Sequence, residues 1–281
     1  MKKFISIYGP TASGKTDLGI EIANKTNGII VNFDSCQFRN HLHSFTMCPI
    51  DLVENRDFLF NFLEPEENFS CGDFLERLKS IIDTYKNRTI ILVGGTGFYL
   101  FCALQGISKD KSHNCSQIID PNKTYEEKFQ LLQSLEGNVK IHKNDHYRID
   151  RHLNFFLKYG YSINNRTSAP LILKKDMINI YLKPNKETLI TYITERLKKN
   201  FFLMIKEAKI VKYHKKFSRI IGYDDIIKYI NFEISFEDAF NKIIQKTLKY
   251  SKQQKTFFNK KIQHDYIFEE KCEYMKYILY N

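Results

Sequence analysis

A glycine-containing segment near the start of the chain has the composition of a phosphate-binding loop. Residues Gly9-Pro10-Thr11-Ala12-Ser13-Gly14-Lys15-Thr16 fit the pattern GxxxxGK[ST]. The backbone N–H groups of such a loop converge on phosphate oxygens, Lys15 adds a positive charge, and the Thr16 hydroxyl can hold Mg²⁺. The motif predicts that a diphosphate ester binds here. It leaves kinases, ATP binding and group transfer from other diphosphates all open.

A carboxylate follows the second apolar segment of the chain. Asp34 comes directly after the predicted strand at 28–33, and parallel α/β sheets bind their ligands at the carboxyl ends of strands. A carboxylate there can take a proton from a poor nucleophile as a new bond forms. It could equally cap a helix or ligate Mg²⁺. The glycine-rich segment 94–97 also follows a predicted strand, and it fits a tight turn as well as a site.

The elements that position these residues alternate between strand and helix patterns. Apolar, β-branched segments at 3–8, 28–33, 89–93 and 178–182 predict strands, and helical spacing appears at 17–25 and 74–85. We therefore expect an α/β fold, with a P-loop NTPase-like parallel sheet core, helices on both faces and a mainly helical insertion. The expected division is 1–105 for the first part of the core, 106–170 for the insertion and 171–281 for the second part. The insertion includes predicted helices at 125–135 and 148–159, the latter ending near Gly160, and the chain is expected to be mostly helical from 186 to its end.

Composition narrows the class of protein. The 281 residues are 43% hydrophobic and carry a formal net charge of +11. Such a charge favours a polyanionic partner through phosphate neutralisation, although only nine of the 43 basic residues are arginine, a bias that an AT-rich genome also produces. No apolar segment reaches the roughly 20 residues of a membrane helix. The six cysteines form no CxxC pair, so we expect reduced thiols in a cytosolic protein.

Several motifs in order resemble those of the bacterial-type tRNA dimethylallyltransferase family. They begin with the phosphate-binding loop GPTASGKT and continue as DSCQ at 34–37, DF at 73–74 and GGTGFYL at 94–100. NDHYRIDR at 144–151, RIIGY at 219–223 and TLKYSKQQKTFF at 247–258 follow the family pattern more loosely. The resemblance runs over nearly the whole chain, from residue 9 to about 260. It implies transfer of a dimethylallyl group from dimethylallyl diphosphate to N6 of adenosine 37, beside the tRNA anticodon.

The resemblance also implies roles for individual residues. Asp34 would be the base, Arg219 would hold the diphosphate leaving group, and Thr16 would ligate the Mg²⁺ cofactor. The residues expected to contact the anticodon stem-loop are Asp34, Ser35, Cys36, Gln37, Thr96, Tyr147, Arg148, Ile149, Asp150, Arg151 and Lys252. From the residues alone, Arg148 and Arg151 lie three apart on one helix face and can reach the same phosphate backbone, or they form a solvated face. We expect a monomer with no membrane partner.

The chain departs from the family pattern mainly where RNA contact is expected. Arg39 stands where the family has tyrosine, Leu248 and Gln253 stand where it has arginines, and Phe257 replaces tryptophan. The family's GTAKP and VPHHLID segments are not retained. A P-loop small-molecule kinase and a non-catalytic RNA-binding member of the family are the alternatives.

Overall fold

The computed structural model describes residues 3–64, 67–106, 119–120, 122–137, 139–165, 169–211, 215–270 and 273–274. Contacts divide the chain into two compact units. One unit combines Met1–Leu104 with Ile172–Asn281, and the other is Gln105–Leu171. The first unit is therefore built from two separate stretches of sequence.

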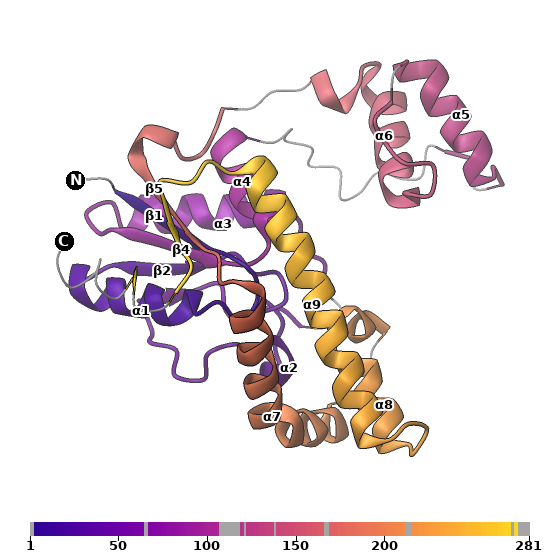
Figure 1. Ribbon diagram of the computed structural model, residues 1–281. Coiled ribbons are helices and arrows are strands. Elements are labelled where there is room, and N and C mark those ends of the chain that lie inside the picture. The colour runs from indigo at the N-terminus through magenta and orange to yellow at the C-terminus, as the bar shows by residue number, and fades with distance from the viewer. Residues whose placement is uncertain are drawn as a thin grey trace. The chain divides into compact units, whose positions relative to one another are not determined.

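Among the described residues, six strands form one parallel sheet in the first unit, in the order β3-β2-β4-β1-β5-β6 (Figure 1). The strands are β1 (Phe4–Tyr8), β2 (Ile29–Asn32), β3 (Asp57–Phe58), β4 (Ile90–Gly94), β5 (Met177–Leu182) and β6 (Tyr266–Phe268). The sequence predicted β1, β2, β4 and β5 but not the edge strands, which are too short to show a period. In the described residues after 186, β6 is the one strand among helices.

Helices cover both faces of this sheet, which confirms the predicted fold class (Figure 1). Successive side chains of a strand face opposite sides, and Val93 of β4 packs with Leu18 on α1 (Lys15–Thr26). On the other side lie α3 (Cys71–Thr84) and α4 (Gly97–Gln105). Because β1, β2 and β4 are adjacent and parallel, the loops that follow them meet at one edge of the sheet.

The helix α3 begins at a reciprocal capping pair. The Asp73 N–H donates to the Ser70 hydroxyl at 3.2 Å, and the Ser70 N–H donates to the Asp73 carboxylate at 2.8 Å. Such caps stabilise a helix by about 1 kcal/mol. The next residue, Phe74, is buried in the core. The Asp73-Phe74 motif therefore starts a helix here.

The C-terminal part of the first unit is a group of packed helices. They are α7 (Lys186–Ile210), α8 (Tyr223–Ile230) and α9 (Phe236–Lys261), with the short α2 (His43–Thr46) against α7 (Figure 1). Buried side chains of all four elements share one apolar cluster, including Phe45, Leu197, Phe201, Met204, Tyr223 and Ile243. The one-turn segments η2 (Lys174–Asp176) and η3 (Lys215–Arg219) precede β5 and α8.

The second unit, taken by itself, contains α5 (Tyr125–Glu136), α6 (His146–Tyr159) and the turn η1 (Ile163–Asn165). Its described core consists of Ile119, Leu132, Ile149 and Leu153. The helix α6 ends at Gly160, whose φ of 77° lies in the left-handed region that favours glycine. Of the helices in the described ranges of either unit, none has both the length and the apolar character that crossing a membrane requires.

Candidate functional site

The loop Gly9–Thr16 connects β1 to α1 and forms part of the wall of a cavity of about 590 Å³. Ala12 and Gly14 both have positive φ, 65° and 81°, so the backbone curls in the way that turns successive N–H groups inward. The Lys15 amine donates to the Pro10 carbonyl across the loop at 2.7 Å. All residues from Thr11 to Thr16 line the cavity.

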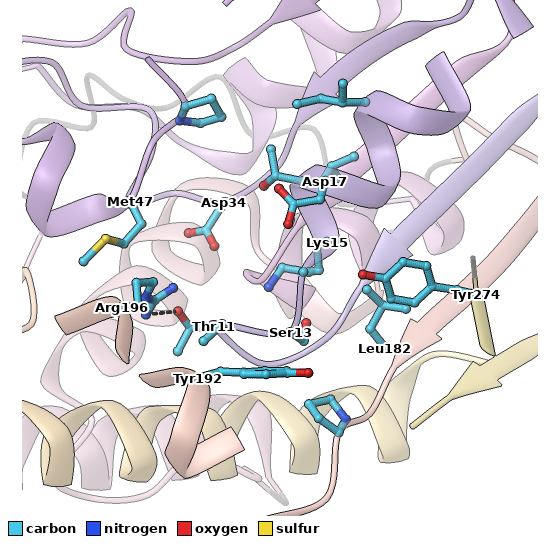
Figure 2. Close-up of a pocket in the computed structure, with 18 of the residues that line it drawn as sticks. Thr11, Ser13, Lys15, Asp17, Asp34, Met47, Leu182, Tyr192, Arg196 and Tyr274 are labelled. Carbon is cyan, nitrogen blue, oxygen red and sulfur yellow. Dashed lines mark hydrogen bonds between the residues drawn. The ribbon is translucent and has the colours of Figure 1, made fainter. Parts of the chain in front are cut away.

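Two cations turn toward the space in front of this loop. Figure 2 shows the Lys15 amine and the Arg196 guanidinium facing the same region as the Asp34 carboxylate. Burial lowers the pKa of Lys15 to about 8; the Asp34 charge opposes this shift and the Arg196 charge adds to it. Burial likewise lowers the pKa of Arg196 to about 10 against the attraction of Asp34. Partly desolvated cations of this kind are stabilised by a bound anion.

The Ser13 side chain gives a second indication of an anion site. It is 6% exposed, and within the described part of the chain its hydroxyl has no hydrogen-bond partner. An unsatisfied buried hydroxyl costs about 1–3 kcal/mol. An anion accepting a hydrogen bond from Ser13 in the cavity would remove that cost.

The carboxylate of Asp34 is held in one orientation by the loop after β4. Its Oδ2 accepts from the Gly95 N–H at 3.1 Å, and its Oδ1 accepts from the Cys36 N–H at 3.2 Å and the Thr96 hydroxyl at 3.4 Å. The buried Asn32 accepts from the Asp34 N–H at 2.9 Å and so fixes the turn after β2. Sequence reasoning missed the role of Asn32 in fixing this turn. Asp34 also lines the cavity in front of the phosphate-binding loop.

The residues beside Asp34 have mainly positioning contacts. Ser35 donates its N–H to the Thr96 hydroxyl at 3.1 Å, and Gln37 donates to the Met47 carbonyl at 2.9 Å, which ties α2 to the site. Burial, with the Asp34 charge, raises the pKa of the Cys36 thiol to about 12. Cys36 therefore stays a neutral thiol and is not a nucleophile.

Arg219, which the family resemblance assigns to the leaving group, does not line the cavity at the phosphate-binding loop. It lies in η3 and lines a separate cavity of about 290 Å³ together with Lys246, Lys249 and Tyr250. Its charge lowers the pKa of Arg39, after the larger effect of burial. Of the described arginines, the one that lines the cavity at the phosphate-binding loop is Arg196.

Sequence reasoning missed Arg196 although one signal was present. Arg196 lies on α7 between Ile193 and Leu197, both of which are buried. An arginine at the border of an apolar helix stripe faces the protein rather than open solvent. Its guanidinium donates to the Thr11 hydroxyl at 2.9 Å.

Residues of α6 that were expected to contact RNA divide into exposed and buried groups. Tyr147 is 76% exposed, and Arg148 and Arg151 are also exposed. Ile149 is fully buried in the core of the second unit. Its side chain is therefore a packing residue, and the expectation that it contacts RNA is corrected. Asp150 forms an ion pair with Lys128 at 3.1 Å.

The basic residues of α9 also have two kinds of environment. Lys249 and Lys252 are exposed, and the exposed Lys246 forms an ion pair with Asp225 at 2.7 Å. The Lys255 amine instead donates to the Pro184 carbonyl at 2.7 Å. Lys255 therefore contributes to the packing of α9 against the core.

The sheet topology, the loop between β1 and α1 and the carboxylate that follows β2 define an α/β protein of the P-loop-like fold. The IPP transferase family model matches residues 54–261. The tRNA dimethylallyltransferase of Rickettsia conorii is 30% identical over 297 residues, which cover 93% of this chain and 78% of that protein. The tRNA dimethylallyltransferase 2 of Geotalea uraniireducens is 29% identical, with 94% and 92% of the two chains covered.

Solved structures agree with this fold. A eukaryotic dimethylallyltransferase acting on tRNA superimposes with a TM-score of 0.79 at 22% identity, over 92% of this chain and 70% of that one. The tRNA isopentenylpyrophosphate transferase of Staphylococcus epidermidis gives a TM-score of 0.61 at 24% identity, over 94% and 92%. The protein belongs to the IPP transferase family.

Proposed function

We propose that this protein transfers a dimethylallyl group from dimethylallyl diphosphate to N6 of adenosine 37 beside the tRNA anticodon. The products are N6-isopentenyladenosine and diphosphate. Membership of the IPP transferase family and the names of its relatives support this enzymatic activity. The observation that carries the proposal is that Asp34 lines the same cavity as the phosphate-binding loop.

The phosphate-binding loop, Lys15 and Arg196 hold the diphosphate in this mechanism. As the allylic C1–O bond breaks, its electron pair leaves with the diphosphate, and these fixed charges stabilise the developing negative charge. The N6 lone pair forms the new bond to C1. Asp34 accepts the proton that N6 loses, which completes the balance. Arg219 is assigned to the RNA rather than to the leaving group because it lines the separate cavity.

A divalent cation fits the residues of this cavity. Mg²⁺ keeps water and phosphate oxygens as most of its ligands and takes one or two from protein. The Thr16 hydroxyl lines the cavity together with the carboxylates of Asp17 and Asp34, although the described residues contain no group of three or more His, Cys, Asp or Glu that could hold a metal. Thr16 would therefore be the residue that holds Mg²⁺ in this cavity. A bound Mg²⁺ would neutralise charge on the leaving group.

A small cavity of about 70 Å³ adjoins the first and is suited to the allylic group. The two cavities share Thr11, Asp34, Thr46, Met47 and Arg196. The other residues of the small cavity are mainly apolar and come from α2, α7, α9 and the segment before α8. Apolar walls keep water away from a carbon that would otherwise react with it. Tyr250 lines both this cavity and the one containing Arg219. We infer that a target adenine taken out of its stack approaches Asp34 from the side of Tyr250.

Basic surfaces of both units are suited to the tRNA backbone. The first unit provides Arg219 with Lys249 and Lys252, and the second provides Arg148 and Arg151. Lysines on α9 can replace the missing family arginines as non-specific positive charge. A cytosolic location and a monomeric state stay predictions from the sequence.

The proposal is tested by incubating the protein with dimethylallyl diphosphate, Mg²⁺ and an unmodified tRNA that reads codons beginning with U. Nucleoside mass spectrometry then measures isopentenyladenosine. We expect product from the unaltered protein and from Asp83→Asn, an exposed carboxylate paired with Lys79 far along α3. Asp34→Asn should lower the rate about 10²- to 10⁴-fold.

The other outcomes identify the alternatives. Consumption of ATP with no prenylated nucleoside indicates a kinase. Binding of tRNA without product from any variant indicates a non-catalytic RNA-binding protein. Either result refutes prenyl transfer.

A further inference from the structure

The amide side chain of Gln254 connects two loops that the mechanism uses separately. Gln254 lies on α9 and is 5% exposed. Its Oε1 accepts from the Thr11 N–H of the phosphate-binding loop at 2.8 Å. Its Nε2 donates to the Gly95 carbonyl, in the loop after β4, at 3.0 Å. One side chain therefore fixes the spacing between these loops.

The two residues that Gln254 binds, Thr11 and Gly95, each form a hydrogen bond with a group assigned to the reaction. The Thr11 hydroxyl accepts from Arg196 at 2.9 Å, and the Gly95 N–H donates to Asp34 Oδ2 at 3.1 Å. The contacts around Gly95 are close: a Cβ added there would overlap the Gln254 amide nitrogen and lie 2.8 Å from Asp34 Oδ2. A continuous set of contacts thus joins the cation that faces the leaving group to the carboxylate that faces the nucleophile.

The chemistry of the contact requires an amide. The Thr11 N–H needs an acceptor and the Gly95 carbonyl needs a donor, and glutamine supplies one of each at the same position. A thioether of similar length supplies neither in useful strength, and an ionised carboxylate cannot donate. The Tyr250 side chain, one helical turn earlier, contacts the side chains of Thr96 and Gln254, so α9 meets this loop at two places.

We propose that Gln254 is a positioning residue that holds the phosphate-binding loop and the Asp34 carboxylate at the separation that prenyl transfer requires, an inference that rests on the proposed function. Loss of its hydrogen bonds leaves the cations and the loop able to hold diphosphate. It allows Asp34 to move relative to the bound donor. A displacement of about 1 Å at reacting groups can cost on the order of 100-fold in rate.

The test compares Gln254→Met with a matched control on the same helix, Gln245→Met, where the glutamine is exposed. The measurements are the single-turnover rate of prenyl transfer with saturating donor and tRNA, the Kd for inorganic diphosphate, and the melting temperature. For Gln254→Met we expect the rate to fall about 100-fold, with a change in Kd of less than about threefold, since the diphosphate contacts remain. The control should match the unaltered protein in all three.

Gln254→Glu separates positioning from a loss of packing. When its carboxyl group is protonated, glutamate both donates and accepts like the original amide, and when it is ionised it cannot donate to Gly95. The rate of this variant divided by that of the unaltered protein at the same pH should rise as the pH is lowered. A purely structural defect would give a ratio that does not change with pH.

Each of three kinetic or binding results would overturn the proposal: a normal single-turnover rate for Gln254→Met, a rate loss matched by an equal loss of diphosphate affinity, or a pH-independent ratio for Gln254→Glu. Hydrogen exchange at the Thr11 amide separates this inference from the proposed function. If the unaltered protein forms no product, the proposed function fails and the catalytic part of the inference fails with it. Unchanged Thr11 exchange in Gln254→Met refutes the connection itself.

Discussion

Replacing Arg196 with alanine should weaken diphosphate binding far more than replacing Arg219. Arg196 lines the cavity at the phosphate-binding loop, and Arg219 lines a different cavity. A hydrogen bond between a charged guanidinium and an anion contributes about 1.5–3 kcal/mol to binding. At about 1.4 kcal/mol for each factor of ten, its loss corresponds to roughly 10- to 150-fold in Kd. Part of this loss is offset, because the Arg196 charge lowers the pKa of Lys15 and its removal leaves Lys15 more fully protonated.

Isothermal titration with inorganic diphosphate at pH 7 measures the effect. Arg196→Lys keeps the charge but loses the planar fork, so its affinity should lie between those of Arg196→Ala and the unaltered protein. Arg219→Ala should change the diphosphate Kd by less than about threefold. In the same variant, the slope of tRNA affinity against salt concentration should fall by the equivalent of about one phosphate contact. Equal losses of diphosphate affinity in the two alanine variants would refute the assignment, as would normal affinity in Arg196→Ala.

Two further predictions concern charge and packing. The pKa of Lys15 is lowered to about 8 by burial, so above pH 8 the free protein loses this charge, whereas a bound diphosphate favours the charged form. Binding of diphosphate at pH 9 should therefore take up a proton, and the affinity for diphosphate should fall as the pH rises through 8. Calorimetric titrations in buffers of different ionisation enthalpy measure the proton uptake. An uptake that Lys15→Met does not reduce would contradict this explanation. Ile149→Ala should lower the free energy of unfolding of the second unit by about 2–5 kcal/mol, which circular dichroism on heating measures. Arg148→Ala should leave the melting temperature unchanged and weaken tRNA binding in a salt-dependent way. Unchanged melting in the Ile149 variant would show that this residue is not part of the core.

The sequence predicted the central strands, the phosphate-binding loop and the carboxylate after β2. Each is a local feature: apolar β-branched segments form buried strands, and the loop motif has a fixed spacing between a strand and a helix. Asp34 was identifiable because it directly follows a strand, and carboxyl ends of parallel strands share one edge. The edge strands β3 and β6 were not predicted because two or three residues carry no periodic signal.

Residues of one sequence motif differ in how far their side chains are buried, which the sequence did not show. Tyr147 and Ile149 belong to the same segment of the family resemblance, yet one is 76% exposed and the other is fully buried. A helix repeats every 3.6 residues, so neighbours in sequence face different sides. Likewise Lys252 is exposed, whereas Lys255 on the same helix donates to a backbone carbonyl of the core.

By itself, the sequence determined the class of fold and the chemistry available at the loop between β1 and α1, because those depend on residue types at short spacing. The tertiary structure decided which distant residues complete the site. Arg196 and Gln254 lie 185 and 243 residues from Thr11, and both side chains donate to or accept from it. No pattern along the chain links positions so far apart. The folding of α7 and α9 against the core brings them to the loop, whereas Arg219 lines another cavity together with residues of α8 and α9.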